Sequence, residues 1–92
     1  AEELLRADAA EAARAVLRLI DVPLSDGQFD ALVSFTFNLG AGALQRSSLR
    51  QKLNRAEYPA AAEEFPRWVW SAGRKLPGLI KRRNAEKMRF LS

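Results

Sequence analysis

The side chains that could do chemistry in this sequence are carboxylates, because the chain contains no cysteine and no histidine. Cysteine nucleophiles, Ser-His triads, disulfides and Cys/His metal sites are therefore excluded. Acid–base hydrolysis would need one carboxyl with a raised pKa and a second carboxylate across the reacting bond. Glu63 and Glu64 are adjacent in a predicted helix and diverge, while Glu2, Glu3 and Glu11 are typical solvated helix charges. We therefore expect no catalytic residue, no metal site and no cofactor in this chain.

A candidate binding edge lies where a hydrophobic segment stops, in the stretch Asn38-Leu-Gly-Ala-Gly42. Glycines expose backbone carbonyl and N–H groups with no side chain in the way. The Asn38 amide adds an acceptor and a donor at the same edge. An acetamido group also offers one C=O and one N–H, so this edge could pair with an N-acetyl sugar. The same pattern, taken alone, also fits an ordinary glycine after a helix.

Helices must position this edge. Apolar residues at three- and four-residue steps predict one amphipathic helix over residues 2–20, which Asp21-Val22-Pro23 ends. Ser25 and Gln28 form a capping-box pattern, so the next helix should cover about 26–38. That helix is apolar nearly all round, which is typical of a central core helix. Its polar stripe, at steps of four, consists of Asp30, Ser34 and Asn38.

The second half of the chain predicts three shorter helical segments. One runs from Ser47 or Ser48 through about Arg55, and one begins at Tyr58-Pro59 and is kinked or split at Pro66. The last covers about 78–91, with Leu79, Ile80, Met88, Phe90 and Leu91 as its apolar residues. No segment is predicted to be a strand. The fold class is therefore all-α, with five or six helices around the helix at about 26–38 and a single domain over 1–92.

Charge is distributed unevenly along the chain. Residues 1–42 hold three Lys/Arg and seven acids, a net charge of −4, whereas residues 43–92 hold twelve Lys/Arg and four acids, a net charge of +8. A basic half suggests a polyanionic partner such as nucleic acid, anionic lipid or an acidic cell wall, or simply a solvated basic face. No apolar run approaches the ~20 residues of a membrane span, and no export signal is visible.

Four blocks of sequence together resemble one known family. They read LSDGQFDALVSFTFNLGAGAL, SSLRQKLN, AAAEEFPRW and LPGLIKRRNAEKMRFL. Their order and spacing resemble the C-terminal helical lobe of phage-type lysozymes, glycoside hydrolase family 24. The resemblance covers the whole chain and is strongest from Leu24 to Leu91.

The resemblance implies a lysozyme-like helical bundle that forms one wall of a cleft. Such enzymes hydrolyse the β-1,4 bond between N-acetylmuramic acid and N-acetylglucosamine in peptidoglycan. By position, the binding residues implied are Phe37, Asn38, Gly40, Gly42, Leu44, Ser47 and Arg67. Trp68 would be mainly core, and the charges of Lys81-Arg82-Arg83 would face the acidic wall. The resemblance also implies synthesis in the cytoplasm of a bacterium carrying a phage or prophage, and action at the cell wall or periplasm.

One departure from the family determines what we expect of this chain alone. The family's catalytic Glu lies in an upstream lobe, in the arrangement Glu-x8-Asp/Cys-x5-Thr, and that segment is absent here. Asp21, Asp30 and Thr36 match the spacing numerically, but they fall in a turn and a core helix on different sides. We therefore expect an isolated substrate-binding lobe without a catalytic residue. Its partners would be the peptidoglycan glycan strand and the missing N-terminal catalytic lobe. The exposed lobe boundary should also cause some self-association.

Two alternatives stay open at this point. Residues 28–39 and Ser48–Arg55, with Arg50, Lys52 and Arg55, could imitate a helix-turn-helix that binds nucleic acid. Against this, the connection Leu39–Ser47 is longer than the usual three- or four-residue turn. The other alternative is a non-catalytic wall-binding or regulatory module that keeps the lysozyme lobe.

Overall fold

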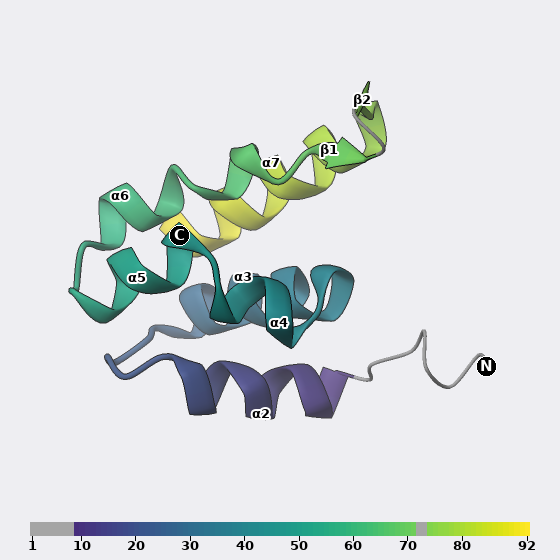
Figure 1. Ribbon diagram of the computed structural model, residues 1–92. Coiled ribbons are helices and arrows are strands. Elements are labelled where there is room, and N and C mark those ends of the chain that lie inside the picture. The colour runs from purple at the N-terminus through teal and green to yellow at the C-terminus, as the bar shows by residue number, and fades with distance from the viewer. Residues whose placement is uncertain (1–8, 72–73) are drawn as a thin grey trace.

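Helix α3, Asp26–Leu39, lies at the centre of the fold, with α2 on one side and α7 on the other (Figure 1). The computed structural model describes residues 9–71 and 74–92. The predicted helical bundle is confirmed, and α2, Ala9–Leu19, is the described part of the helix expected over 2–20. The predicted residues 2–8 of that helix lie outside the described residues. The helix α7 is Pro77–Leu91, close to its predicted range.

The capping box that was expected to start α3 is present. The Ser25 hydroxyl accepts from the Gln28 backbone N–H at 3.1 Å, and the Gln28 side chain accepts from the Ser25 backbone N–H at 2.8 Å. This pair satisfies two of the N–H groups that a helix start leaves without partners. At the other end, Gly40 has φ +96° and its N–H donates to the Thr36 carbonyl. A side chain would be strained in this backbone conformation, which explains the glycine.

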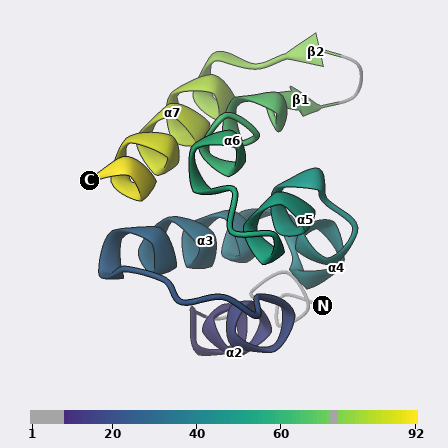
Figure 2. The same cartoon turned by 90° about the vertical axis from the view of Figure 1, so that its left-hand side faces the viewer.

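The elements between α3 and α7 are short. They are α4, Ala41–Gln45; α5, Ser48–Asn54; α6, Tyr58–Ala62; and the 3₁₀ turn η1, Phe65–Arg67. Helices α4 and α5 lie beside the end of α3, and α6 lies next to α7 (Figure 2). The predicted split is confirmed, because the helix that begins at Tyr58 stops before Pro66, which lies inside η1. Helix α4 was not predicted, since its glycines indicated a connection. The prediction of no strand was wrong as well: β1, Trp70–Ser71, pairs antiparallel with β2, Arg74–Lys75.

Aromatic side chains from three elements, together with Trp68 just after η1, meet in the core. Phe35 of α3 makes edge contacts with Phe65 and Trp68, at centroid distances of 5.8 and 5.4 Å, and Phe65 contacts Phe90 of α7 at 5.4 Å. Each such pair adds about 0.5–1.5 kcal/mol beyond the apolar area it buries. The aromatic cluster therefore joins α3, η1 and α7. Among the described residues no helix has the length and apolar character needed to cross a membrane.

The buried face of α7 differs from the apolar face suggested by its sequence. Phe90 is buried, but Met88 is 69% exposed and Leu91 is exposed too. Arg83 and Glu86 are buried instead. The expectation that Arg83 would face an acidic cell wall is therefore wrong, because its guanidinium lies inside the fold.

Helices α3 and α7 approach each other closely at Gly27, and Gly78 serves as a comparison. Each glycine is the second residue of its helix. A Cβ added to Gly27 of α3 would lie 2.5 Å from the Arg89 carbonyl oxygen of α7, whereas one added to Gly78 of α7 would meet nothing within 4 Å. We expect Gly27→Ala to lower the free energy of unfolding by about 1–3 kcal/mol, because the helices must move apart. Gly78→Ala should raise it by up to about 1 kcal/mol, because alanine favours the helix. Urea denaturation measures both, and a destabilisation shared equally by the two variants would contradict the close approach.

Candidate functional site: the groove between α3 and α7

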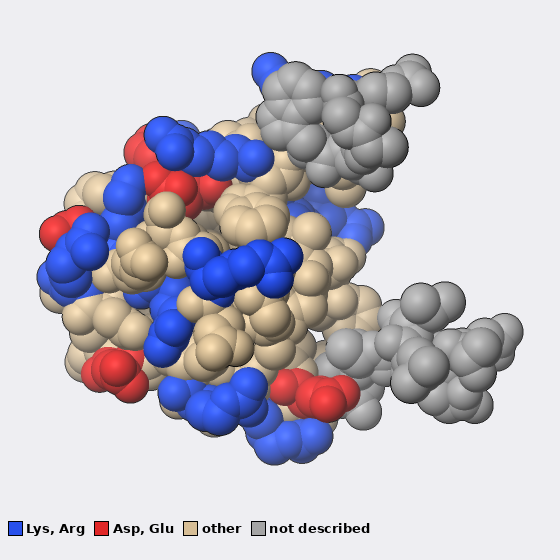
Figure 3. Space-filling model, viewed as in Figure 1, with Lys and Arg blue, Asp and Glu red and all other residues tan. Residues whose placement is uncertain are grey.

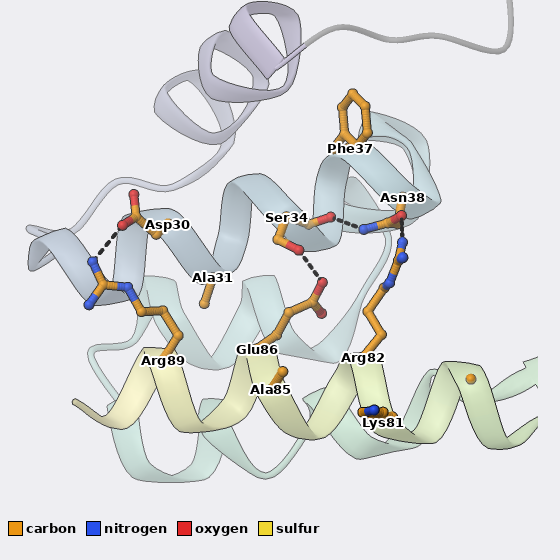
Figure 4. Close-up of a pocket in the computed structure, with 11 residues that line it drawn as sticks. Asp30, Ala31, Ser34, Phe37, Asn38, Lys81, Arg82, Ala85, Glu86 and Arg89 are labelled. Atoms are coloured by element: carbon orange, nitrogen blue, oxygen red, sulfur yellow. Dashed lines mark hydrogen bonds and ion pairs between the residues drawn. The ribbon is translucent and has the colours of Figure 1, made fainter.

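The polar stripe of α3 faces charged residues of α7 in antiparallel order (Figure 4). Arg89 Nη2 contacts Asp30 Oδ2 at 2.6 Å, and the Ser34 hydroxyl donates to Glu86 Oε2 at 2.5 Å. Arg82 donates to the Asn38 side-chain oxygen. Steps of three and four residues keep each row on one face of its helix, so the rows match along about two turns. We call these three pairs the α3–α7 ladder.

A buried ion pair lies behind the middle of this ladder. Arg83 is fully buried and Glu86 is 4% exposed. Arg83 Nε lies 2.9 Å from Glu86 Oε1, and Arg83 Nη2 donates to Glu86 Oε2 at 3.0 Å. The guanidinium carbon also lies 5.6 Å from the centre of the Phe35 ring, a cation–π distance. Glu86 therefore bridges the core and the groove, because it accepts from buried Arg83 and from Ser34 on α3.

Burial dominates the ionisation of both partners. It raises the pKa of Glu86, and the Ser34 hydrogen bond and the Arg83 charge oppose that rise. Burial also lowers the pKa of Arg83, against the opposing charge of Glu86. Arg83 Nη1 makes no hydrogen bond within the described residues, which adds to the cost of burying this guanidinium.

The groove beside the ladder has a volume of about 620 Å³. Its lining includes Ser34 and Glu86, together with Phe37, Lys81 and Arg82. A second, more apolar groove of about 630 Å³ lies between α2 and α3, lined by alanines of α2 with Phe29 and Val33 of α3. Both grooves include Asp30, Ser34 and Phe37 in their lining, so they meet across α3.

Phe37 and Asn38, predicted as binding residues, both line the α3–α7 groove. Phe37 is 46% exposed and lies at the junction of the two grooves. The Asn38 amide was expected to be free, but its Nδ2 donates to the Ser34 carbonyl at 2.7 Å and its Oδ1 accepts from Arg82. Asn38 therefore fixes the groove wall through hydrogen bonds that are already made.

Gly40 and Gly42 lie where α3 turns into α4. Space within 4 Å of a Cβ at Gly40 is open, and the nearest atom to a Cβ at Gly42 is Arg46 Nη1 at 3.6 Å. No side chain caps the start of α4, because Gly40 occupies that position. Asn38 and Gly42 are exposed, whereas residues 39–41 between them are half-buried. Asn38 lines the α3–α7 groove and the two glycines lie beyond its lining, so a sugar-binding role for this edge stays a prediction.

The other three predicted binding residues lie away from this groove. Leu44 is fully buried in the core, so its predicted binding role is wrong for the side chain. Ser47 is also buried, where its hydroxyl donates to the Leu44 carbonyl at 2.8 Å and caps α5. Arg67 is exposed and lines a different pocket, with Trp68 beside it. Phe37 and Arg67 therefore do not belong to one pocket.

Within residues 9–71 and 74–92, the residues that matched the catalytic spacing are not assembled into a site. Thr36 is buried and Asp30 pairs with Arg89 on the surface. Among the described residues no cluster of three or more acids could hold a metal ion. Sequence reasoning missed Glu86 and Arg83. The signal for Glu86 was the row of charges at steps of four and three residues, Arg82, Glu86 and Arg89, which matches the polar stripe of α3.

The chain is similar to phage lysozymes in sequence and in fold. The family model for phage lysozyme matches residues 1–86. The endolysin of Bacillus phage B103 is 47% identical over 92 residues, which is 100% of this chain and 35% of that relative. The endolysin of Salmonella phage P22 is 40% identical over 90 residues, which is 98% of this chain and 61% of that relative.

Solved structures give the same result. The muramidase domain of SpmX from Asticaccaulis excentricus superposes with a TM-score of 0.86 at 38% identity, covering 98% of this chain and 64% of that chain. The crystal structure of a point mutant of P22 lysozyme gives a TM-score of 0.84 at 39% identity over 98% of this chain and 61% of that chain.

A lysozyme-like helical fold with a groove along its central helix is the class that fold and site define. The chain belongs to the phage lysozyme family. It spans 35% and 36% of the length of the two Bacillus phage endolysins that it matches over its full length.

The pKa of Glu86 is the first testable property of this site. We expect its carboxyl to titrate above the ordinary glutamate value, because burial disfavours the charged form. The folded protein then binds the proton more tightly than the unfolded chain. The stability that this proton contributes is complete below the ordinary glutamate pKa and is lost as pH rises through the raised pKa.

Ser34→Ala should raise the pKa of Glu86 further, because it removes a hydrogen bond that favours the carboxylate. Carboxyl-carbon NMR titration measures both values. Ser48→Ala, which removes an exposed hydroxyl on α5, is the matched control and should leave the Glu86 pKa unchanged. A Glu86 pKa at or below the ordinary value would contradict the buried geometry.

Proposed function

We propose that this chain forms the glycan-holding wall of a peptidoglycan muramidase and that the proton donor comes from polypeptide outside these 92 residues. The observation that carries the proposal is a phage-lysozyme fold with an edge exposed at Asn38 and Gly42. The two carboxylates that line its groove, Asp30 and Glu86, are already paired with Arg89 and Arg83. The wall's contribution would be to position the sugar, which is worth several kcal/mol of a reaction barrier. The proposed place of action is the bacterial cell wall.

Glu86 is the carboxylate that most needs to be considered as an acid, since its pKa is raised and it lines the groove. A general acid must reach the leaving oxygen with its proton. Glu86 is 4% exposed, and its carboxylate is occupied by Arg83 and Ser34. A buried, paired carboxylate of this kind serves structure, which supports an acid supplied from elsewhere.

The proposed glycan contacts are Phe37 and the edge at Asn38, Gly40 and Gly42. The exposed part of the Phe37 ring offers an apolar face for a sugar ring, while the glycines let the backbone approach an acetamido group closely. Asn38 would act by holding the edge, because its own amide is already hydrogen-bonded.

The surface where the two grooves meet is the proposed boundary with a catalytic lobe. It combines the apolar wall of Ala9, Ala10 and Ala13 with Phe29 and Val33, and it is continuous with the ladder groove. Apolar surface of this kind in a chain of this family is most simply covered by further polypeptide. If this surface is uncovered in the isolated chain, we expect some self-association. Sedimentation at rising protein concentration measures it.

Nucleic-acid binding through a helix-turn-helix is disfavoured by the side chains of α5. Arg50 donates to the carbonyls of Leu19 and Gln45, each at 3.0 Å. Lys52 pairs with Glu64 at 2.5 Å, and Arg55 pairs with Glu57 at 3.0 Å. The basic residues that would have to contact bases or phosphates are therefore used within the protein, and α4 lies between α3 and α5.

The proposal predicts a chain that binds glycan and does not cleave it. Purified chain should release no reducing sugar from peptidoglycan. A soluble tetramer of N-acetylglucosamine should shift backbone NMR signals of residues 37–42. Phe37→Ala should weaken this binding by about tenfold, or 1.4 kcal/mol, because it removes the apolar contact. Leu17→Ala, at a 68% exposed apolar residue of α2, is the matched control and should leave the affinity unchanged.

Robust hydrolysis by the 92-residue chain would overturn the proposed division of roles. Binding that is insensitive to Phe37→Ala would overturn the proposed location of the sugar. If Leu17→Ala weakened binding as much as Phe37→Ala, the effect would not be specific to Phe37. That result would also contradict a sugar site at Phe37.

A further inference from the structure

A separate pocket lies apart from the ladder groove, between the α4–α5 turn and η1. It has a volume of about 330 Å³ and is lined by Arg46, Ser47, Ser48, Glu64, Arg67 and Trp68. It shares no lining residue with the ladder groove or with the apolar groove between α2 and α3. Figure 3 shows Lys and Arg side chains on the face that carries α4, α5 and α6, with acidic side chains among them and further basic side chains over α2.

The charge of this pocket is positive. Its acid, Glu64, has a side chain that is 5% exposed, and Lys52 meets one of its oxygens at 2.5 Å. The other oxygen lies 3.9 Å from Arg67 Nε, a long ion-pair distance, and the Arg67 side chain is 74% exposed. Because Lys52 already neutralises Glu64, most of the Arg67 charge is available to a ligand.

Arg46 adds a second available guanidinium. It is exposed and makes no ion pair or hydrogen bond through its side chain to the other described residues. Two arginines that line one pocket without a dedicated acid are suited to bind carboxylate or phosphate oxygens, because each guanidinium offers several N–H donors in a plane.

Trp68 supplies an apolar wall next to these charges. Its ring packs on Phe35 at 5.4 Å, which fixes its orientation, and it remains partly exposed in the pocket. Its indole N–H makes no hydrogen bond to the other described residues. The lining therefore combines an anion-binding pair with a rigid aromatic surface, a combination suited to an anionic group carried on a ring.

We infer that the pocket of Arg46, Arg67 and Trp68 is a second binding site, which takes a carboxylate or phosphate group attached to a sugar or similar ring. The site goes beyond the proposed positioning of the neutral glycan, and it does not depend on Phe37 or on the ladder groove. Its effect would be to hold an anionic polymer at a second point, so that the two sites together bind more tightly than either one.

NMR titration of the 92-residue chain tests this site with four probes. Inorganic phosphate and glycerol 3-phosphate represent phosphate, a muramyl dipeptide represents carboxylate, and N-acetylglucosamine is the neutral comparison. We expect saturable shifts at the side-chain N–H signals of Arg46, Arg67 and Trp68 with at least one anionic probe. The anion that binds more tightly identifies the source of the ligand.

Arg46→Gln and Arg67→Gln should each weaken the anionic probe at least tenfold. Arg14→Gln, which removes an exposed positive charge on α2, should change the affinity by less than twofold. Phe37→Ala should leave binding of the anionic probe unchanged. The experiment therefore distinguishes an error in the proposed glycan site at Phe37 from an error in the proposed anion site. The absence of saturable shifts, equal loss with Arg14→Gln, or equal binding of the neutral sugar would each overturn the site.

Discussion

The ion pair between Arg83 and Glu86 is the constraint on which the arrangement of α3 and α7 depends. Both groups lie inside a small helical fold, where removing two charges from water costs several kcal/mol for each ion. That cost is offset when the pair meets closely and further hydrogen bonds are made. Glu86 meets Arg83 at 2.9 Å and accepts from Ser34 at 2.5 Å, so α7 reaches its lowest free energy in one register against α3.

The groove follows from that register. With Glu86 fixed on Ser34, Arg82 and Arg89 are carried to Asn38 and Asp30 at the two ends of the stripe. The exposed pairs at the ends are worth little in stability, since surface ion pairs contribute about 0–1 kcal/mol. Their value is geometric, because they determine which side chains line the groove next to the edge at Asn38–Gly42. The aromatic contacts of Phe35 contribute stability, the buried pair determines the register, and the exposed rungs shape the surface.

The elements that could be predicted from sequence are those marked by local signals. The capping box at Ser25, the glycine after α3 and the split before Pro66 are local signals that depend on a few neighbouring residues, and they were read correctly. Helix α4 was missed, because the two nearby glycines, Gly40 and Gly42, indicated a connection rather than a helix. The two-residue strands carry no periodicity long enough to recognise.

The candidate site was harder to predict, since it depends on which charges are buried. Arg82 and Arg83 are adjacent and identical in type, yet one lies on the groove and the other is fully buried. Helix rotation alone decides between them, and the apolar residues of α7 give little help, because Met88 and Leu91 are exposed. Asn38 does line the groove, as its position at the end of α3 suggested. Its side-chain oxygen accepts from Arg82, which is 44 residues away in sequence, so the sequence could not show that this oxygen is already hydrogen-bonded.

A double-mutant cycle on the buried pair tests the central claim most directly. Urea denaturation of Arg83→Met, Glu86→Leu and the double variant gives the coupling energy between the two side chains. Each single change leaves an unpaired buried charge and should lower the free energy of unfolding by about 3–5 kcal/mol, while the double change removes both charges. We predict that the double variant loses less than either single variant, with a coupling of at least about 2 kcal/mol. Single effects that add to within about 0.5 kcal/mol would show that the two residues act independently, and the ladder would then need another origin.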